Sequence, residues 1–378
     1  MTTNWDYIST TKPFIQKVWE KAGFNEPTTI QTEAVPFILE GKDVIAESPT
    51  GTGKTLAYLL PILERIDVEQ NDPQAVILAS SRELVMQIFE EVQKWTEDSG
   101  IKGASIIGGA NPKRQLEKLK KHPQVIIGTP GRVEELIKMK KLKMHEVKTV
   151  VLDEVDQLLV PEHLGTVRAI IKSTLNDRQL LLFSATLSEK AVEIGKELTA
   201  NTEVIRVKQQ AIKQGDVDHL YFISERRDKI KVLEKFARMT DVKALAFGKD
   251  IGELQVLKEK MDYKNVPVGL LHSELKKNER QTALKQFRSG KTSLLLATDV
   301  AARGLDVKGL THVIQIDVSE DKGQYLHRAG RTGRAGASGT VVTIVTKGEE
   351  QSLNRMARAL DIQLQKKSFY KGKIVDER

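Results

Sequence analysis

The chain has 378 residues, of which 40% are hydrophobic and 29% are charged, and a chain of this size is expected to form about two packed domains. It contains no cysteine, which excludes a disulfide scaffold, a thiolate metal centre and a cysteine nucleophile. The formal net charge of +8 is uneven, because residues 1–210 sum to −2 and residues 211–378 to +10. A basic second half favours a polyanionic partner, although a solvated basic surface explains the same charge equally well.

The first residues lack the basic and apolar segments of a secretory signal peptide. No apolar run reaches the length of a membrane span. We therefore expect a cytoplasmic protein that does not bind membranes.

Short apolar segments alternate with segments of helical periodicity through the first half of the chain. The predicted strands are 75–79, 125–127, 149–152 and 180–183, and the predicted helices are 81–99, 114–121 and 133–142. Strands that are apolar throughout and separated by helices are typical of a parallel sheet covered on both faces.

The same alternation restarts after the polar segment 208–216. The predicted strands are 220–224, 243–247, 266–271, 293–297, 312–316 and 340–345, and the predicted helices are 230–239, 251–261, 274–289 and 349–360. The polar segment is typical of a linker. We therefore predict two tandem α/β domains, at 1–207 and 217–378, joined by residues 208–216. The last 18 residues after Leu360 carry several lysines and no predicted element.

The most specific local pattern is Ser-Pro-Thr-Gly-Thr-Gly-Lys-Thr at residues 48–55, between an apolar segment and a helical run. Glycines at 51 and 53 allow backbone amides to surround phosphate oxygens. The lysine supplies a positive charge for the β- and γ-phosphates, and the last threonine supplies a hydroxyl for Mg²⁺. The pattern predicts a nucleotide site made of Ser48, Pro49, Thr50, Gly51, Thr52, Gly53, Lys54 and Thr55.

Three carboxylates follow the predicted strand 149–152, at Asp153, Glu154 and Asp156. Asp153 is suited to hold Mg²⁺ through its water shell, and Glu154 is suited to orient or deprotonate an attacking water. Alone, this cluster is equally well explained as a solvated turn. Together with the phosphate loop it predicts a nucleoside triphosphatase.

These two elements, with further motifs in the same order, resemble those of the DEAD-box RNA helicases, which are two-domain ATPases of helicase superfamily 2. The resemblance runs from about Phe24 to Gly336 and implies two RecA-like domains, each a mostly parallel sheet with helices on both faces, that use ATP and Mg²⁺. Val155 stands where the family name has alanine. The short segment after Leu360 resembles the minimal-core bacterial members, which lack a C-terminal extension.

The segment Gly23–Gln31 resembles the Q motif of this family. The resemblance implies that the amide of Gln31 binds the adenine edge and that Phe24 packs against the base. The family has a further aromatic residue upstream. Trp5 and Tyr7 both lie near its usual spacing, and we predict Trp5.

Three further elements of the first half resemble the RNA-binding motifs of the family. Ser80–Leu84 is similar to the family's P-T-R-E-L element, with serine in place of both proline and threonine. The resemblance implies contacts with the RNA backbone from Arg82, Gly109, Thr129 and Arg132. The two arginines are alternatively explained as members of structural ion pairs.

The Ser-Ala-Thr sequence at 184–186 resembles the coupling motif of the family. The resemblance implies that hydroxyls of Ser184 and Thr186 bond carboxylates of the 153–156 segment, Asp156 among them. Nucleotide state would then be linked to domain closure.

Two longer motifs of the second half, 297–306 and 325–334, match the family almost throughout. The resemblance implies that Arg331 and Arg334 act as arginine fingers on the γ-phosphate. It also implies that Asp306 meets the ribose, that His327 belongs to the coupling machinery, and that Arg280 and Thr298 contact RNA.

The predicted function is an ATP-dependent RNA helicase that couples ATP hydrolysis to local RNA duplex separation or to remodelling of RNA–protein complexes. We expect a monomer that acts on single-stranded or short duplex RNA, with ribosomal precursors and ribosome assembly as the favoured setting. Three alternatives stay open: an ATP-gated RNA clamp with little unwinding, a superfamily 2 DNA helicase, and a phosphate-loop NTPase with another partner.

Overall fold

The computed structural model describes residues 7–109, 111–207, 217–302, 307, 309–319, 321–333 and 337–377. The chain divides into two compact units, Met1–Ile212 and Lys213–Arg378, and each is described by itself. The predicted linker, 208–216, lies outside the described residues.

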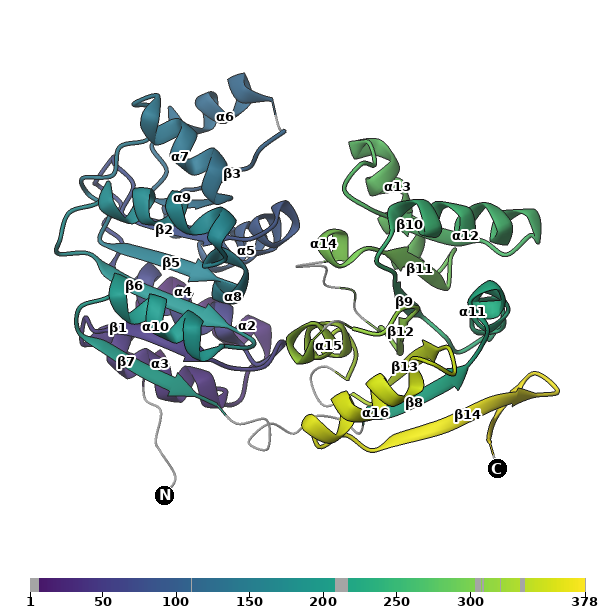
Figure 1. Ribbon diagram of the computed structural model, residues 1–378. Coiled ribbons are helices and arrows are strands. Elements are labelled where there is room, and N and C mark those ends of the chain that lie inside the picture. Colours follow the sequence, from purple (N-terminus) through teal and green to yellow (C-terminus); the bar gives the residue numbers. More distant parts are fainter. Residues whose placement is uncertain are drawn as a thin grey trace. The chain divides into compact units, whose positions relative to one another are not determined.

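The first domain alternates helices and strands along the chain (Figure 1). Its elements are α1 (Tyr7–Thr10), α2 (Pro13–Ala22), α3 (Thr29–Leu39), β1 (Asp43–Glu47), α4 (Lys54–Arg65), β2 (Ala75–Ala79), α5 (Arg82–Trp95), β3 (Gly103–Ile106), α6 (Pro112–Leu119), β4 (Val125–Gly128), α7 (Pro130–Lys138), β5 (Thr149–Asp153), α8 (Val155–Leu158), α9 (Pro161–Lys172), β6 (Gln179–Ser184), α10 (Glu189–Leu198) and β7 (Thr202–Arg206).

The seven strands of this domain form one parallel sheet in the order β3-β4-β2-β5-β6-β1-β7. Alternate strand residues enter two separate cores. Val44 and Ile77 pack with helices α2 to α5, whereas Ile45 and Val76 pack with α7, α9 and α10 on the other face. The central strand β2 is covered on both faces and is apolar throughout, whereas the edge strand β7 carries partly exposed polar residues. The polar residues that follow the strands therefore gather at the carboxyl edge of the sheet.

The second domain repeats this arrangement. Its elements are β8 (Val217–Ile223), the 3₁₀ helix η2 (Arg226–Asp228), α11 (Lys229–Ala237), β9 (Ala244–Phe247), α12 (Ile251–Tyr263), β10 (Val268–Leu271), α13 (Lys277–Arg288), β11 (Leu294–Ala297), α14 (Asp299–Ala302), β12 (His312–Gln315), α15 (Lys322–Ala329), β13 (Gly339–Val345), α16 (Glu350–Ala359), β14 (Leu364–Tyr370) and β15 (Lys373–Asp376). The sheet order is β10-β11-β9-β12-β13-β8-β14-β15, which matches the first sheet position by position up to β14.

The predicted fold class is confirmed: both sheets are mostly parallel and lie between helices. The segment after Leu360, for which no element was predicted, is an exception. Strand β14 pairs with β8 in parallel and then turns back into the antiparallel β15. Its anchor is Phe369, whose ring lies 5.0 Å from Phe222 and 5.4 Å from Phe236. Two adjacent aromatics, Phe369 and Tyr370, next to lysines give no clear period, so the pattern alone did not predict a strand.

Within the part of the chain that the structure describes, none of the helices combines the length and apolar character that crossing a membrane requires.

Candidate nucleotide and RNA site

The loop 48–55 connects β1 to α4 at the carboxyl edge of the first sheet. Gly51 and Gly53 have φ angles of 81° and 88°, a region that favours glycine. A Cβ atom on Gly53 would also lie 2.6 Å from Nε2 of Gln31. Neither conformation nor space admits another residue at Gly53, so this glycine is required by the shape of the loop. The first backbone N–H groups of α4 have no partner within the helix, and such groups can bind an anion at this end of the helix.

Lys54 opens α4, and its ammonium group lies inside this loop. It donates hydrogen bonds to the carbonyl oxygens of Ser48 at 2.5 Å and Pro49 at 2.9 Å. The hydroxyls of Ser48 and Thr52 are 2.7 Å apart, and Thr52 also donates to the Pro49 carbonyl at 2.8 Å. The two bonds to carbonyls hold the Lys54 ammonium inside the loop, and a positive charge at this place suits phosphate oxygens.

Gln31 joins the predicted adenine site to the phosphate loop. It is buried, its amide oxygen accepts a hydrogen bond from the Thr28 backbone, and its Nε2 donates to the Gly53 carbonyl at 3.3 Å. The ring of Phe24 is partly exposed and lies 5.1 Å from that of Trp19. Tyr7 packs against the first core, whereas Trp5 lies outside the described residues. The adenine contacts stay a prediction.

Asp153 ends β5 and is buried beside a residue that the motif analysis did not single out. The hydroxyl of Tyr58, one turn into α4, donates to Oδ2 of Asp153 at 2.9 Å. The Glu154 backbone N–H donates to Oδ1 at 3.0 Å. Burial raises the pKa of Asp153, and the positive charge of Lys54 opposes that rise. The only available signal for Tyr58 was its spacing of one helical turn after the Lys-Thr pair.

The other two carboxylates of the Asp-Glu-Val-Asp segment are held by neighbouring strand ends. Ser184, the last residue of β6, donates to Oδ1 of Asp156, so two of the four residues predicted to couple the nucleotide to RNA are in contact. The Ser80 hydroxyl, directly after β2, donates to Oε2 of Glu154. Thr186 is half-buried beyond β6. No role for Ser80 was predicted from the sequence.

The predicted RNA residues of the first domain follow β2, β3 and β4. Arg82 begins α5, and a Cβ atom built on Gly109 would lie 2.8 Å from its Nη1, so these two positions are adjacent. Thr129 precedes α7 as its N-cap residue. Arg132 is paired with Glu135 at 2.5 Å, and its side chain is only 9% exposed. Arg132 thus forms the structural ion pair that was the alternative to RNA binding, and its contact with RNA stays a prediction.

The second-domain residues are grouped around α13 to α15. Arg331 and Thr298 are buried, His327 is half-buried, and Arg280 donates to the Ala301 carbonyl at 2.9 Å. Asp306 and Arg334 lie outside the described residues.

The buried Arg328, which the motif analysis did not single out, forms two short bonds with Asp299, at 2.7 and 2.6 Å. This charge-assisted fork fixes α15 against α14, and a buried arginine of this kind needs such a partner.

The residues at the first edge fit a magnesium nucleotide. Any Cβ at position 53 would press on the Gln31 amide and the Thr28 hydroxyl beside the loop, and the buried carboxylate of Asp153 lies in the electrostatic field of Lys54. Among the described residues no cluster of three or more acidic or histidine side chains forms a dedicated metal cage. Mg²⁺ needs none here, because it is usually held by one or two protein groups together with substrate phosphates and water.

Comparison with known proteins agrees with this geometry. Residues 28–194 match the family model described as DEAD/DEAH box helicase, and residues 225–336 match the helicase conserved C-terminal domain. The chain is 54% identical to a Bacillus subtilis protein named "Probable ATP-dependent RNA helicase YfmL", over 99% of both chains. It is 52% identical to the Bacillus cereus "DEAD-box ATP-dependent RNA helicase CshC", over 98% of this chain and 95% of that one. The chain belongs to the DEAD-box helicase family.

The solved structures that it resembles include a DEAD-box protein in complex with RNA. The chain superimposes on S. cerevisiae Dbp5 bound to RNA and ADP BeF3 with a TM-score of 0.88 at 30% identity, covering 96% of this chain and 95% of that one. The predicted family and the two RecA-like folds are therefore confirmed. The roles of individual residues stay predictions.

Proposed function

We propose that this DEAD-box protein is an RNA-dependent ATPase that couples ATP hydrolysis to local, largely sequence-independent separation of RNA duplexes. The observation that carries the proposal is the grouping of the Lys54 loop, Asp153, Glu154 and the Asp156–Ser184 pair at one sheet edge. Relatives of more than 50% identity that are named ATP-dependent RNA helicases support it.

The residues of the first domain would hold the nucleotide as follows. Lys54 and the amides of the loop 48–55 bind the phosphates, and Thr55 and Asp153 hold Mg²⁺. Gln31, with the aromatics Phe24 and Trp5, recognises adenine. Magnesium ATP supplies a transferable phosphoryl group whose charge the metal partly neutralises.

Catalysis needs a base and groups that stabilise the developing charge. Glu154 orients the attacking water and accepts its proton. Arg331 and Arg334 are proposed as arginine fingers, and a finger of this kind contributes about 10³- to 10⁵-fold in rate. Asp306 is proposed as the residue that binds the ribose. Asp156, Ser184, Thr186 and His327 are proposed to couple the nucleotide to RNA.

RNA binding is proposed to rest on phosphate and sugar contacts. These come from Arg82, Gly109, Thr129 and Arg132 in the first domain and from Arg280 and Thr298 in the second. Contacts of this type give affinity without reading sequence, and they weaken as salt concentration rises. We further propose a monomeric cytoplasmic protein, with RNA–protein complexes such as ribosomal precursors as its substrates.

The test is steady-state ATP hydrolysis with single-stranded RNA, duplex RNA or matching DNA, with Glu154→Gln as the inactive control. We expect stimulation by RNA only, loss of hydrolysis in the control, and ATP-dependent release of one strand from a short RNA duplex. Equal stimulation by DNA would favour a general superfamily 2 helicase. RNA-stimulated hydrolysis without strand release would favour the ATP-gated clamp, and no stimulation by either nucleic acid would refute the proposal.

A further inference from the structure

The carboxylate of Glu154 is held by the end of a neighbouring strand. Strands β2 and β5 pair in parallel with Ala79 opposite Asp153. The next residues along the two strands, Ser80 and Glu154, therefore leave the sheet side by side. Glu154 turns away from β5 with a left-handed φ of 60°, and the Ser80 hydroxyl donates to its Oε2. Both side chains are half-buried.

The same short segment begins the predicted RNA surface. Ser81 caps α5, since its hydroxyl accepts a hydrogen bond from the Leu84 backbone N–H at 3.2 Å. Arg82 is the first residue of that helix and lies beside Gly109. Only Ser81 separates the residue that bonds Glu154 from the arginine proposed to contact RNA.

This hydrogen bond depends on a departure from the family motif. The family's P-T-R-E-L element has proline where this chain has Ser80, and a proline side chain carries no hydrogen-bond donor. A bond from a hydroxyl to Oε2 occupies one of the lone pairs that would accept a hydrogen bond from water, and it holds the carboxylate toward β2. Since the bond is absent from the family pattern, hydrolysis itself does not require it.

We propose that Ser80 is a positioning residue that restrains Glu154 and ties this carboxylate to the segment that begins the RNA surface. The inference rests on the proposed function. RNA that binds at Arg82 would contact a segment only two residues from Ser80, whose hydroxyl bonds the Glu154 carboxylate. Ser80 thereby lowers hydrolysis in the absence of RNA and makes the rate more dependent on RNA.

The experiment compares Ser80→Ala and Ser80→Pro, which remove the donor, with Ser80→Thr, which keeps it. Without RNA, we expect kcat to rise about 3- to 10-fold in the first two variants, the change in rate that corresponds to the net free energy of one typical hydrogen bond. At saturating RNA we expect kcat to stay near the wild-type value. Ser80→Thr should behave as wild type. A destabilised protein loses activity, so a gain in rate separates restraint from a merely structural role.

Two controls sharpen the result. Ser81→Ala removes the neighbouring helix cap without touching Glu154, and it should not raise the RNA-free rate. Affinity for a fluorescent ADP analogue with Mg²⁺ should be equal in wild type and Ser80→Ala, which shows that the phosphate loop is intact.

An unchanged or lowered RNA-free rate in Ser80→Ala and Ser80→Pro would overturn the inference, as would a rise in Ser80→Thr equal to theirs. If Ser80→Ala does not fold, Ser80→Pro, which carries the family's own residue, decides. Wild type without RNA-stimulated hydrolysis would instead refute the proposed function. RNA stimulation in wild type that is unaltered by Ser80 substitutions refutes only the inference.

Discussion

The two domains share one strand order, and β1 of the first sheet takes the same place as β8 of the second. The α-helix that follows each of these strands begins with a lysine, but the two lysines have different surroundings. Lys54 follows β1 and Lys229 follows β8, which takes the same place in its sheet. Lys54 lies in a loop shaped by Gly51 and Gly53 and bonds the carbonyls of that loop. Lys229 instead follows the 3₁₀ helix η2, whose residues are Arg-Arg-Asp.

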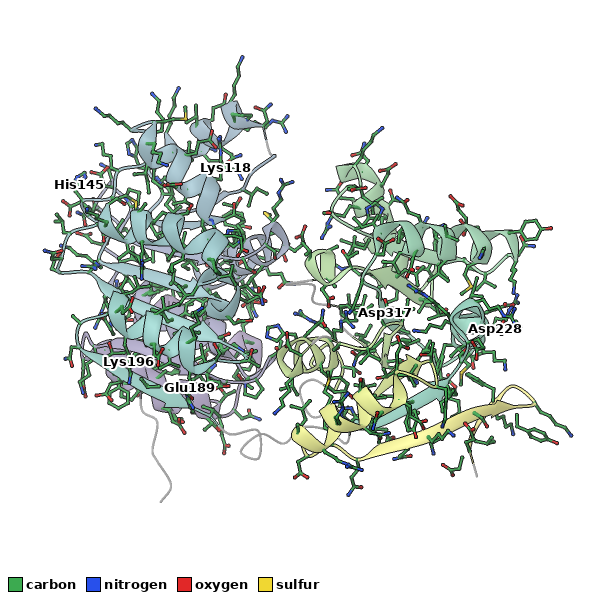
Figure 2. The ribbon with its side chains drawn as sticks, viewed as in Figure 1. Lys118, His145, Glu189, Lys196, Asp228 and Asp317 are labelled. Carbon is green, nitrogen blue, oxygen red and sulfur yellow. The ribbon has the colours of Figure 1, made fainter. Side chains whose placement is uncertain are left out.

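The buried Lys229 is neutralised by the domain's own groups. Its ammonium donates to the Ile316 carbonyl at 2.6 Å and lies 3.8 Å from Asp317 and 3.6 Å from Glu349. Lys229, Asp317 and Glu349 line a pocket of about 900 Å³, and Figure 2 labels Asp317. A lysine at the same place in the topology is thus satisfied by carboxylates rather than available to phosphates. The strand order brings polar residues to the carboxyl edge of each sheet. The residues of the loops at that edge then determine which ligand can bind there.

Replacing Lys54 should have the largest effect. Lys54→Ala removes the charge proposed for the β- and γ-phosphates, and we expect kcat for ATP to fall about 10²- to 10³-fold, as for other groups that stabilise developing charge. Circular dichroism and the unfolding midpoint should stay near wild type, because Lys54 is half-buried and lies outside the apolar core of the domain. A variant that retains more than a tenth of wild-type activity would contradict the role of this loop.

Replacing Lys229 should have the opposite pattern. Lys229→Met leaves Asp317 and Glu349 without their shared cation, and the side chains of these carboxylates are 21% and 42% exposed. We expect the free energy of unfolding to fall by about 2 kcal/mol, below the 3–5 kcal/mol typical of a fully buried pair because water reaches both partners. Urea denaturation measures this loss. Affinity of the folded variant for nucleotide should be unchanged, and a tenfold loss would break the contrast between the two lysines.

The sequence predicted the elements that are buried on both faces, such as 75–79 and 149–152, because continuous apolar runs have one interpretation. It also located Lys54, Asp153 and Glu154, whose residue types are set by phosphate and metal chemistry. It did not locate β14, which lies between β8 and β15, because the few apolar residues of this strand stand among lysines and give no clear period. The partners Tyr58 and Ser80 were not predicted, because contacts between α4 and β5, or between β2 and β5, depend on register rather than on local pattern.

The strands β1 and β8 also differ in an ionisable side chain, His219. This residue of β8 is partly buried, its Nδ1 lies 2.8 Å from the Tyr325 hydroxyl, and burial lowers the pKa of its imidazole to about 4. An unfolded histidine titrates near 6.5, so the unfolded chain binds a proton first as pH falls. The associated stability is fully present above pH 6.5 and is lost progressively down to pH 4, to a total of about 3 kcal/mol.

Urea denaturation at pH 7, 5.5 and 4 measures this dependence. The matched variant is His219→Asn, whose amide oxygen retains an acceptor for Tyr325 but does not titrate. Its pH dependence should be weaker than that of wild type by about the amount assigned to His219. Parallel curves for the two proteins would show that other groups cause the acid sensitivity.

The smallest effect is expected for replacing Tyr58. This tyrosine bonds Asp153 at the edge of the first sheet, whereas Asp317, at the edge of the second sheet, has a different hydrogen-bond donor. Asp153 accepts the Tyr58 hydroxyl at 2.9 Å, whereas Asp317 accepts the Lys249 backbone N–H at 3.1 Å. Tyr58→Phe removes one oxygen atom from a buried contact, and we expect a loss of about 1.5 kcal/mol in the free energy of unfolding. Because Asp153 is the proposed Mg²⁺ ligand and Tyr58 orients its carboxylate, the Mg²⁺ concentration for half-maximal ATP hydrolysis should also rise. The matched control is Tyr221→Phe in the second domain, whose hydroxyl bonds Glu350 at 3.1 Å. That variant should leave the Mg²⁺ dependence unchanged, so an equal rise in both proteins would show that loss of a tyrosine hydroxyl acts through general stability and not through Asp153.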